Sequence, residues 1–190
     1  MLFVEKEIAI DLGTSSTLLY VRGKGISMRE PTVVAVDKVT GKLLKVGSEA
    51  EKMLGRTPAN IVAIHPIANG VISDYDMTTR MLQELLSRVT SFSFFKPSVI
   101  VCVPGSITGV EERAIIDATI EAGARKVYLL ETAVATAAGA GIDYVKPEDI
   151  AYVARNFKGV HTASSSSESS TASDGTIPRS ILLLTVRSTP

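Results

Sequence analysis

Several residue types are scarce in this chain of 190 residues, and each scarcity excludes a class of protein or site. The single cysteine, Cys102, excludes an intramolecular disulfide, and two distant histidines argue against a zinc cluster. No apolar run reaches the roughly 18 residues of a membrane span, and the charged start around Lys6 lacks the apolar stretch of a signal peptide. We therefore expect a soluble, cytoplasmic protein.

The chain also lacks net charge. Its 20 Lys and Arg are balanced by 20 Asp and Glu, whereas binding to a nucleic-acid backbone needs an excess of cations. We therefore expect no nucleic-acid partner. The composition is that of a globular protein, with 45% apolar and 21% charged residues, and the length is enough to bury a sizeable core.

Residues 146–190 differ in composition from residues 1–145. Between Thr162 and Thr176, ten of fifteen residues are Ser or Thr, and they follow no apolar periodicity. Such a segment cannot bury enough surface to offset the entropy lost on ordering. The sequence predicts a folded domain over 1–145, with a small lobe around 36–64, and a disordered tail over 146–190.

Apolar periodicity predicts a mixed α/β domain. The expected strands are Glu7–Asp11, Thr17–Arg22, Pro31–Val36, Leu43–Val46, Ser98–Val103 and Val127–Glu131; the expected helices are Asp76–Thr90, Thr108–Gly123 and Thr132–Ala140. A loop of hairpin length separates the first two strands, so these should pair antiparallel. The order strand, helix, strand after Ser98 predicts parallel neighbours. The helices at 76–90 and 108–123 could cover one face of the sheet or both.

The segment 11–17, Asp-Leu-Gly-Thr-Ser-Ser-Thr, is the most informative for function. A tight turn between strands presents backbone N–H groups and up to four hydroxyls in a small space, which suits phosphate oxygens. Asp11 supplies a carboxylate that a phosphate-bound Mg²⁺ could reach directly or through water. An ordinary hairpin turn uses the same residue types, so the pattern alone leaves both interpretations open.

The sequence on both sides of this loop resembles the MreB/Mbl family of bacterial actin homologues. The resemblance runs in register from Glu7 to Ile142, and its separate motifs are Glu7–Ile26, Glu30–Ala35, Val46–Ala50, Gly70–Asp74, Val101–Pro104, Val110–Ala114, Ala118–Val127 and Gly139–Ile142. It implies an actin-like (ribonuclease H-like) mixed sheet with flanking helices, with the first domain only. It also implies an ATPase that forms filaments under the inner membrane and guides cell-wall synthesis.

The resemblance assigns roles to individual residues. The loop that wraps the β- and γ-phosphates of ATP corresponds to Asp11, Gly13, Thr14, Ser15, Ser16 and Thr17, with Mg²⁺ near Asp11. The family commonly has Asn at Ser16, and a glutamate that orients the attacking water at Thr132, next to Glu131. A threonine can hydrogen-bond a water but cannot act as a carboxylate base. Glu131 and Thr132 are therefore the catalytic candidates, and binding of ATP without hydrolysis stays open.

The resemblance stops before the second half of the family's fold. Soon after Gly141 the family continues into a second phosphate loop and a second domain that holds the adenosine, and residues 150–190 resemble neither. We expect a chain truncated relative to the family, by a frameshift, early termination or a gene-model error, with weak ATP binding. The implied partners are the chain itself or a full-length homologue, the inner membrane surface and the cell-wall synthesis machinery. The alternatives are a non-catalytic fragment and a sugar or acetate kinase.

Three of the five phenylalanines lie together at Phe92, Phe94 and Phe95, between a predicted helix and a predicted strand. Exposed rings flanked by Arg88 and Lys96 could insert shallowly into a bilayer while the cations meet anionic headgroups; the same rings could instead cap the core. Proteins similar to MreB use an apolar loop at this place to sit on the membrane. The resemblance therefore favours Phe94 and Phe95 as membrane contacts, and a peripheral location at the inner face of the cell membrane.

Overall fold

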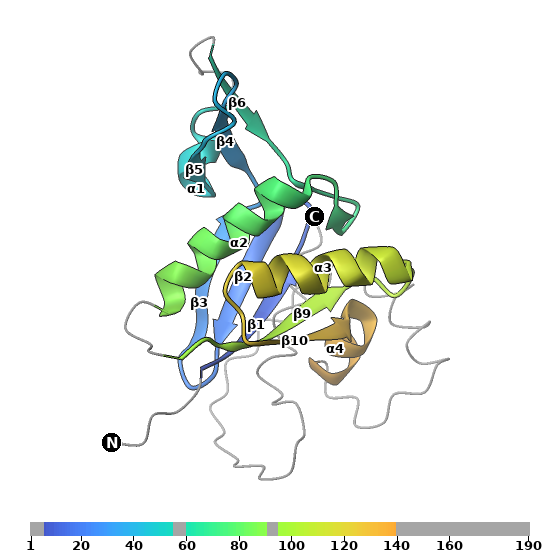
Figure 1. The fold of residues 1–190 in the computed structure, drawn as a ribbon. Helices are drawn as coiled ribbons and strands as arrows, with labels where there is room; N and C mark the ends of the chain where they lie inside the picture. The colour runs from blue at the N-terminus through green and yellow to red at the C-terminus, as the bar shows by residue number, and fades with distance from the viewer. Residues whose placement is uncertain (1–5, 55–59, 91–94, 140–190) are drawn as a thin grey trace.

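A five-stranded mixed sheet forms the main body of the computed structural model, which describes residues 6–54, 60–90 and 95–139 (Figure 1). The strand order is β10-β9-β1-β2-β3, with β1 Glu7–Leu12, β2 Ser16–Val21, β3 Gly25–Pro31, β9 Ser98–Val103 and β10 Lys126–Glu131. β1, β9 and β10 run parallel, whereas β2 and β3 pair antiparallel. The mixed sheet predicted from the sequence is confirmed.

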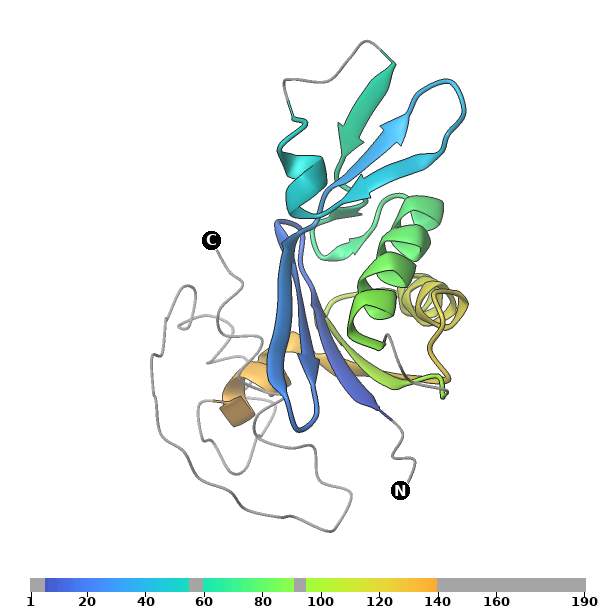
Figure 2. The ribbon, with the colours of Figure 1, turned by 90° about the vertical axis from the view of Figure 1, so that its left-hand side faces the viewer.

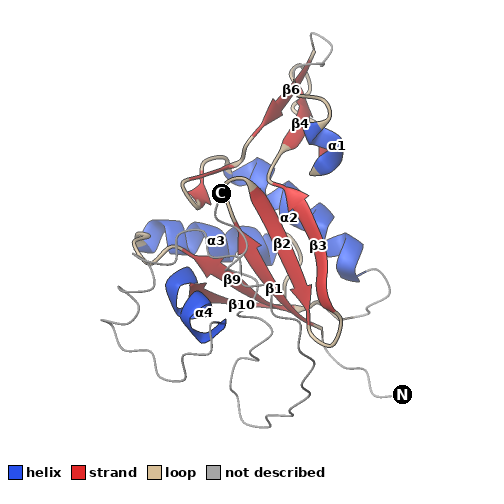
Figure 3. Ribbon diagram, turned by 180° about the vertical axis from the view of Figure 1, so that it is seen from behind, coloured by secondary structure: helices blue, strands red, loops and turns tan. Residues whose placement is uncertain are grey.

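Helices lie on both faces of this sheet, as Figures 2 and 3 show. α2 (Tyr75–Thr90) and α3 (Gly109–Glu121) lie on one face, and α4 (Thr132–Gly139) lies on the other. The main core is on the α2/α3 face, where Ile8 and Ile10 pack against the buried stripe of α2. Because side chains alternate along a strand, Ala9 and Asp11 point to the α4 face. The sequence left open whether the helices at 76–90 and 108–123 cover one face of the sheet or both; α2 and α3 cover the same face.

A smaller lobe stands at one end of the main sheet. Its sheet has the order β5-β4-β6, built from β4 (Val34–Asp37), β5 (Leu43–Val46) and β6 (Ile61–Ile64), with the short α1 (Ser48–Glu51) beside it. Val33, Ala35 and Ala50 are its buried centre. Residues 31–34 lead into this lobe, and the chain returns through 64–67 into a hairpin of β7 (Ile67–Ala68) and β8 (Val71–Ile72).

One strand prediction was wrong. The expected strand Pro31–Val36 is instead the end of β3 and most of β4, separated at Thr32 and Val33 where the chain leaves the main sheet. β3 itself was missed because it is an edge strand, with a side-chain burial pattern that does not alternate cleanly. Within the described ranges no helix is long and apolar enough to cross a membrane. Phe94 and the predicted tail 146–190 lie outside those ranges.

Candidate functional site

The carboxyl ends of the three parallel strands meet at one edge of the main sheet. β1 ends in the loop 13–15, β9 ends before Pro104 and Gly105, and β10 ends at Glu131, where α4 begins. Ligands of open α/β sheets bind outside the carboxyl ends of the strands. The partial positive charge at the N-terminus of an α-helix, here α4, favours negative charge at the same edge. The predicted phosphate loop and both catalytic candidates therefore lie on one edge of the molecule.

The loop after β1 is tight and requires glycine. A Cβ added to Gly13 would lie 2.8 Å from the carbonyl oxygen of Ser16, closer than a Cβ carbon approaches another atom to which it is not bonded. Thr14 and Ser15 are exposed at the tip, while Ser16 is half-buried at the start of β2. Exposed backbone N–H groups and hydroxyls at the tip can donate to an anion.

The β7–β8 turn supports this loop from one side. Asn69 and Gly70 both have positive φ angles, 53° and 78°, as in the tightest hairpin turns. The N–H of Gly70 donates to Oγ1 of Thr14 at 3.0 Å, and a Cβ at Gly70 would lie 2.7 Å from Cγ of Pro104. The turn therefore fits between the loops that follow β1 and β9. The Asn-Gly pair was the available sequence signal for it, and it was missed.

Thr32 supports the loop from the core side. Its hydroxyl donates to the carbonyl of Gly13 at 2.7 Å, and its N–H donates to the carbonyl of Ser15 at 3.0 Å. The hydroxyls of Thr17 and Thr32 are 2.9 Å apart, and both residues are fully buried. Since the one hydroxyl proton of Thr32 goes to Gly13, the Thr17 hydroxyl is the donor to Thr32. Thr17 thus braces the loop, and its contact with phosphate stays a prediction.

Asp11 lies at the end of β1 with 5% of its surface exposed, opposite Cys102 in the register with β9. Mg²⁺ in phosphate sites is held by one or two carboxylates together with phosphate oxygens and water. In the described part of the chain, no group of three or more His, Cys, Asp or Glu could hold a metal ion by itself. A single carboxylate fits a cation that arrives with a nucleotide, which is the role predicted for Asp11.

Glu131 and Thr132 follow β10, whereas the phosphate loop follows β1, and β9 lies between these two strands. Two strand spacings separate them, a distance of about 10 Å. The Thr132 hydroxyl donates to the carbonyl of Val103 at 3.0 Å, so its one proton is occupied. Its lone pairs can still accept a hydrogen bond from water, but it cannot remove a proton from that water. The half-buried Glu131 side chain lies over Gly105, where an added Cβ would be 2.6 Å from its Cδ.

Cations gather at the opposite end of the main sheet. Backbone hydrogen bonds from Ser98 to Lys6, from Arg22 to Glu7 and from Arg125 to Pro97 bring four chain segments together there. These segments, 6–7, 22–24, 95–98 and 124–126, hold one acidic residue, Glu7, which pairs with Arg22 at 2.6 Å. Their six cations are Lys6, Arg22, Lys24, Lys96, Arg125 and Lys126. We call this surface the basic end.

Apolar groups accompany the cations at the basic end. Phe95, one of the two predicted membrane contacts, is 51% exposed there. Beside the cations is a hollow of about 290 Å³, whose lining combines Lys6 and Lys24 with the apolar Met28 and Val89. The basic end therefore presents both positive charge and apolar surface.

Comparison with known sequences points to one family. The sequence model of the MreB/Mbl protein family matches residues 5–153. The cell shape-determining protein Mbl of Bacillus cereus is 47% identical over 143 residues, and the cell shape-determining protein MreB of Escherichia coli is 49% identical over 142. These alignments cover 75% and 72% of this chain but 43% and 41% of the relatives. The chain therefore spans about two fifths of the length of the curated relatives it matches.

Solved structures agree with the sequence comparison. MreB5 of Spiroplasma citri bound to ADP matches with a TM-score of 0.67 and 32% identity, over 75% of this chain and 43% of that one. The same protein bound to AMPPNP matches with a TM-score of 0.63 over 74% and 42%. The MamK double helical filament has a TM-score of 0.64 at 17% identity, over 73% of this chain and 44% of that one, and at that identity supports the fold alone. The actin-like fold expected from the resemblance is confirmed.

Proposed function

The chain belongs to the MreB/Mbl family, and from this premise we propose that it is an actin-like cell-shape protein that binds ATP through the loop 11–17. One observation carries the proposal. The tight turn at Gly13 stands at the carboxyl edge of the parallel strands, held by Thr32 and Gly70, with its exposed tip at the same edge as the start of α4. Such a rigid cluster of donors is suited to phosphate oxygens.

The nucleotide assignment agrees with what similar proteins bind. The two MreB5 structures that this fold matches are bound to ADP and to AMPPNP. In the proposed site, Thr14, Ser15 and Ser16 would donate to the phosphates, and Asp11 would hold the Mg²⁺ that the nucleotide brings, directly or through water. Mg²⁺ would supply charge neutralisation there, and the chain's own groups would orient the phosphates.

We propose that this chain binds ATP without efficient hydrolysis. Thr132 stands where the resemblance places the residue that orients water, and its proton is committed to Val103. Glu131, its neighbour in the chain, has a carboxylate, but that side chain lies over Gly105. The site can therefore position a water but has no well-placed base.

We further propose self-association and membrane attachment. The first partner is another copy of the chain or a full-length homologue, in keeping with the filament assembled by MamK, which shares the fold. The basic end, with exposed Phe95, is the surface proposed to lie on the inner face of the cell membrane. Association with the cell-wall synthesis machinery is proposed from family membership. The family model and the relatives named above favour the cell-shape protein over the kinase alternative.

Titration calorimetry with Mg-ATP on residues 1–190 tests the nucleotide proposal. We expect weak binding that Asp11→Ala lowers at least about tenfold further, because contacts to a charged group typically contribute this much. Asp76→Ala, which removes an exposed aspartate from α2, is the matched control and should bind like the wild type. A folded chain with no affinity for Mg-ATP would favour the non-catalytic fragment. Phosphate release that Glu131→Gln abolishes would show that Glu131 acts as the base.

A further inference from the structure

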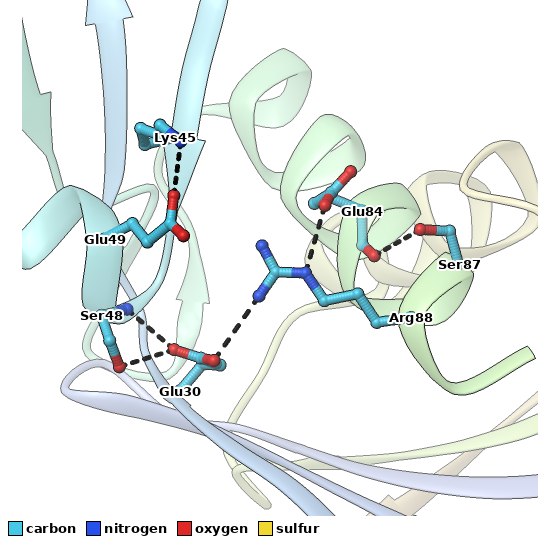
Figure 4. Close-up of polar contacts among 7 residues, drawn as sticks. All are labelled: Glu30, Lys45, Ser48, Glu49, Glu84, Ser87 and Arg88. Atoms are coloured by element: carbon cyan, nitrogen blue, oxygen red, sulfur yellow. Dashed lines mark hydrogen bonds and ion pairs between the residues drawn. The ribbon is translucent and has the colours of Figure 1, made fainter. Parts of the chain in front are cut away.

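Glu30 and Thr32 lie two residues apart where the chain passes from the main sheet to the small lobe. Thr32 holds the phosphate loop through its hydroxyl and its N–H. Glu30 contacts the small lobe instead. Its Oε2 accepts hydrogen bonds from the N–H and the hydroxyl of Ser48, at 2.7 and 2.8 Å. Ser48 opens α1 of the small lobe (Figure 4). A single short segment therefore contacts both the loop and the lobe.

The contact between Glu30 and Ser48 depends on a glycine. Gly47 has a φ of 70°, and an added Cβ would lie 2.8 Å from Cδ of Glu30. Its N–H donates to the carbonyl of Val33, which ties the same turn to the crossing segment. A side chain at this position would push the carboxylate away from Ser48 and strain the backbone.

Arg88, on α2 of the main body, also contacts Glu30. Its Nη1 lies 3.5 Å from Oε1 of Glu30, and its Nε donates to Oε1 of Glu84 at 3.1 Å (Figure 4). The Glu30 side chain is 18% exposed, so this pair is less screened by water than the exposed pair of Lys45 and Glu49 nearby. We call Glu30, Ser48 and Arg88 the lobe latch, since they join β3, α1 and α2.

We propose that the lobe latch and the phosphate loop are coupled through Thr32. The latch fixes Glu30 against the small lobe, and the ring of Pro31 restricts the backbone between Glu30 and Thr32. Movement of the small lobe therefore displaces Thr32 and, with it, the carbonyls of Gly13 and Ser15. Thr32 is a positioning residue for the loop, and the small lobe regulates how tightly the loop holds an anion. By linkage, a nucleotide on the loop must stabilise the latch equally.

Hydrogen exchange on the full chain tests this coupling without any nucleotide. In Glu30→Ala we expect the Thr32 amide and residues 12–17 to exchange about fivefold faster or more, since one hydrogen bond typically contributes this factor. Glu49→Ala is the matched control: it removes a nearby glutamate, on α1 of the small lobe, and breaks its pair with Lys45, but leaves the latch intact. Faster exchange in residues 45–51 alone, with 12–17 unchanged, would overturn the proposal.

The second arm measures Mg-ATP affinity, and here the inference rests on the proposed function. We expect Glu30→Ala and Thr32→Val to weaken binding about fivefold, whereas Thr32→Ser, which keeps the hydroxyl, stays within about twofold of the wild type. If Glu30→Ala and Thr32→Val both bound Mg-ATP with the affinity of the wild type, the coupling would be refuted. If the wild type itself does not bind ATP, the nucleotide proposal fails, and the exchange result still decides between coupled and independent lobes. Ser48→Ala replaces Thr32→Val if circular dichroism shows that the valine variant is unfolded.

Discussion

At the residue scale, threonine hydroxyls stabilise several of the points where the chain enters or leaves a strand or helix. Thr32 and Thr17 brace the phosphate loop, Thr132 holds the end of β9, and Thr108 caps α3. Each hydroxyl has one proton, so a threonine that donates to the backbone has only lone pairs left for a ligand. The exposed Thr14 and Ser15 differ in this respect from Thr17, whose hydroxyl proton goes to Thr32 and whose contact with phosphate stays a prediction.

The cap of α3 predicts a pH dependence of stability. Hydrogen bonds from the N–H and hydroxyl of Thr108 lower the pKa of Glu111 below its ordinary value of 4.5. A carboxyl whose pKa falls on folding stabilises the fold above its unfolded pKa and loses that contribution as pH drops through the folded pKa. We expect Glu111→Gln to unfold at lower denaturant than the wild type at neutral pH, with the gap closing below the ordinary pKa of glutamate.

Urea unfolding at neutral and acidic pH measures this gap. Glu112→Gln is the control, since it removes the same charge from the same turn without touching the Thr108 cap. A gap between Glu111→Gln and the wild type that stays constant with pH would contradict the assigned cause.

At the element scale, the sequence predicted best the segments whose burial is one-sided or complete. β9 has the predicted bounds, and α3 has the predicted capping box at Thr108. β5 also has the predicted bounds, although two of its four residues are exposed. The edge strand β3 and the four-residue α1 were missed because little of either is buried, so neither leaves an apolar pattern. In the site, the loop 11–17 was visible as a motif. Thr32, Gly70 and Pro104 lie within motifs of the resemblance, but their roles at the site were not predicted, because those roles depend on contacts between segments far apart in the sequence.

The β7–β8 turn gives a prediction at this scale. Gly70→Ala places a methyl against the ring of Pro104 at a residue with a φ of 78°, so it introduces both strain and a clash. Gly41→Ala, at a φ of 66° with nothing within 4 Å of the added carbon, introduces the strain alone. We expect Gly41→Ala to cost about 1 kcal/mol of unfolding free energy and Gly70→Ala at least about 1 kcal/mol more. Equal losses of unfolding free energy in the two variants, measured by thermal or urea unfolding, would show that Pro104 moves away from the added methyl at no measurable cost.

At the scale of the whole molecule, neutral composition conceals a separation of charge. The 20 cations and 20 acids cancel overall, yet the basic end holds six cations and one acid, and that acid is already paired. The proposed nucleotide site lies at the other end of the same parallel strands. A molecule arranged in this way can place its basic end on an anionic surface while its phosphate loop stays accessible to solvent.

This separation predicts binding to anionic vesicles that depends on position and not on total charge. Each lysine near an anionic surface contributes about 1 kcal/mol, so Lys24→Glu with Lys96→Glu should lower binding to phosphatidylglycerol vesicles at least about 25-fold. Lys38→Glu with Lys42→Glu makes the same change in net charge on the exposed hairpin of the small lobe and should have little effect.

Phe95→Ser should weaken vesicle binding further at high salt, where the charge contribution is screened and the apolar contribution persists. Co-sedimentation with phosphatidylcholine vesicles separates the two contributions. If both pairs of lysine substitutions reduced vesicle binding equally, attraction would depend on net charge alone, and the proposal that the basic end is the membrane surface would be wrong.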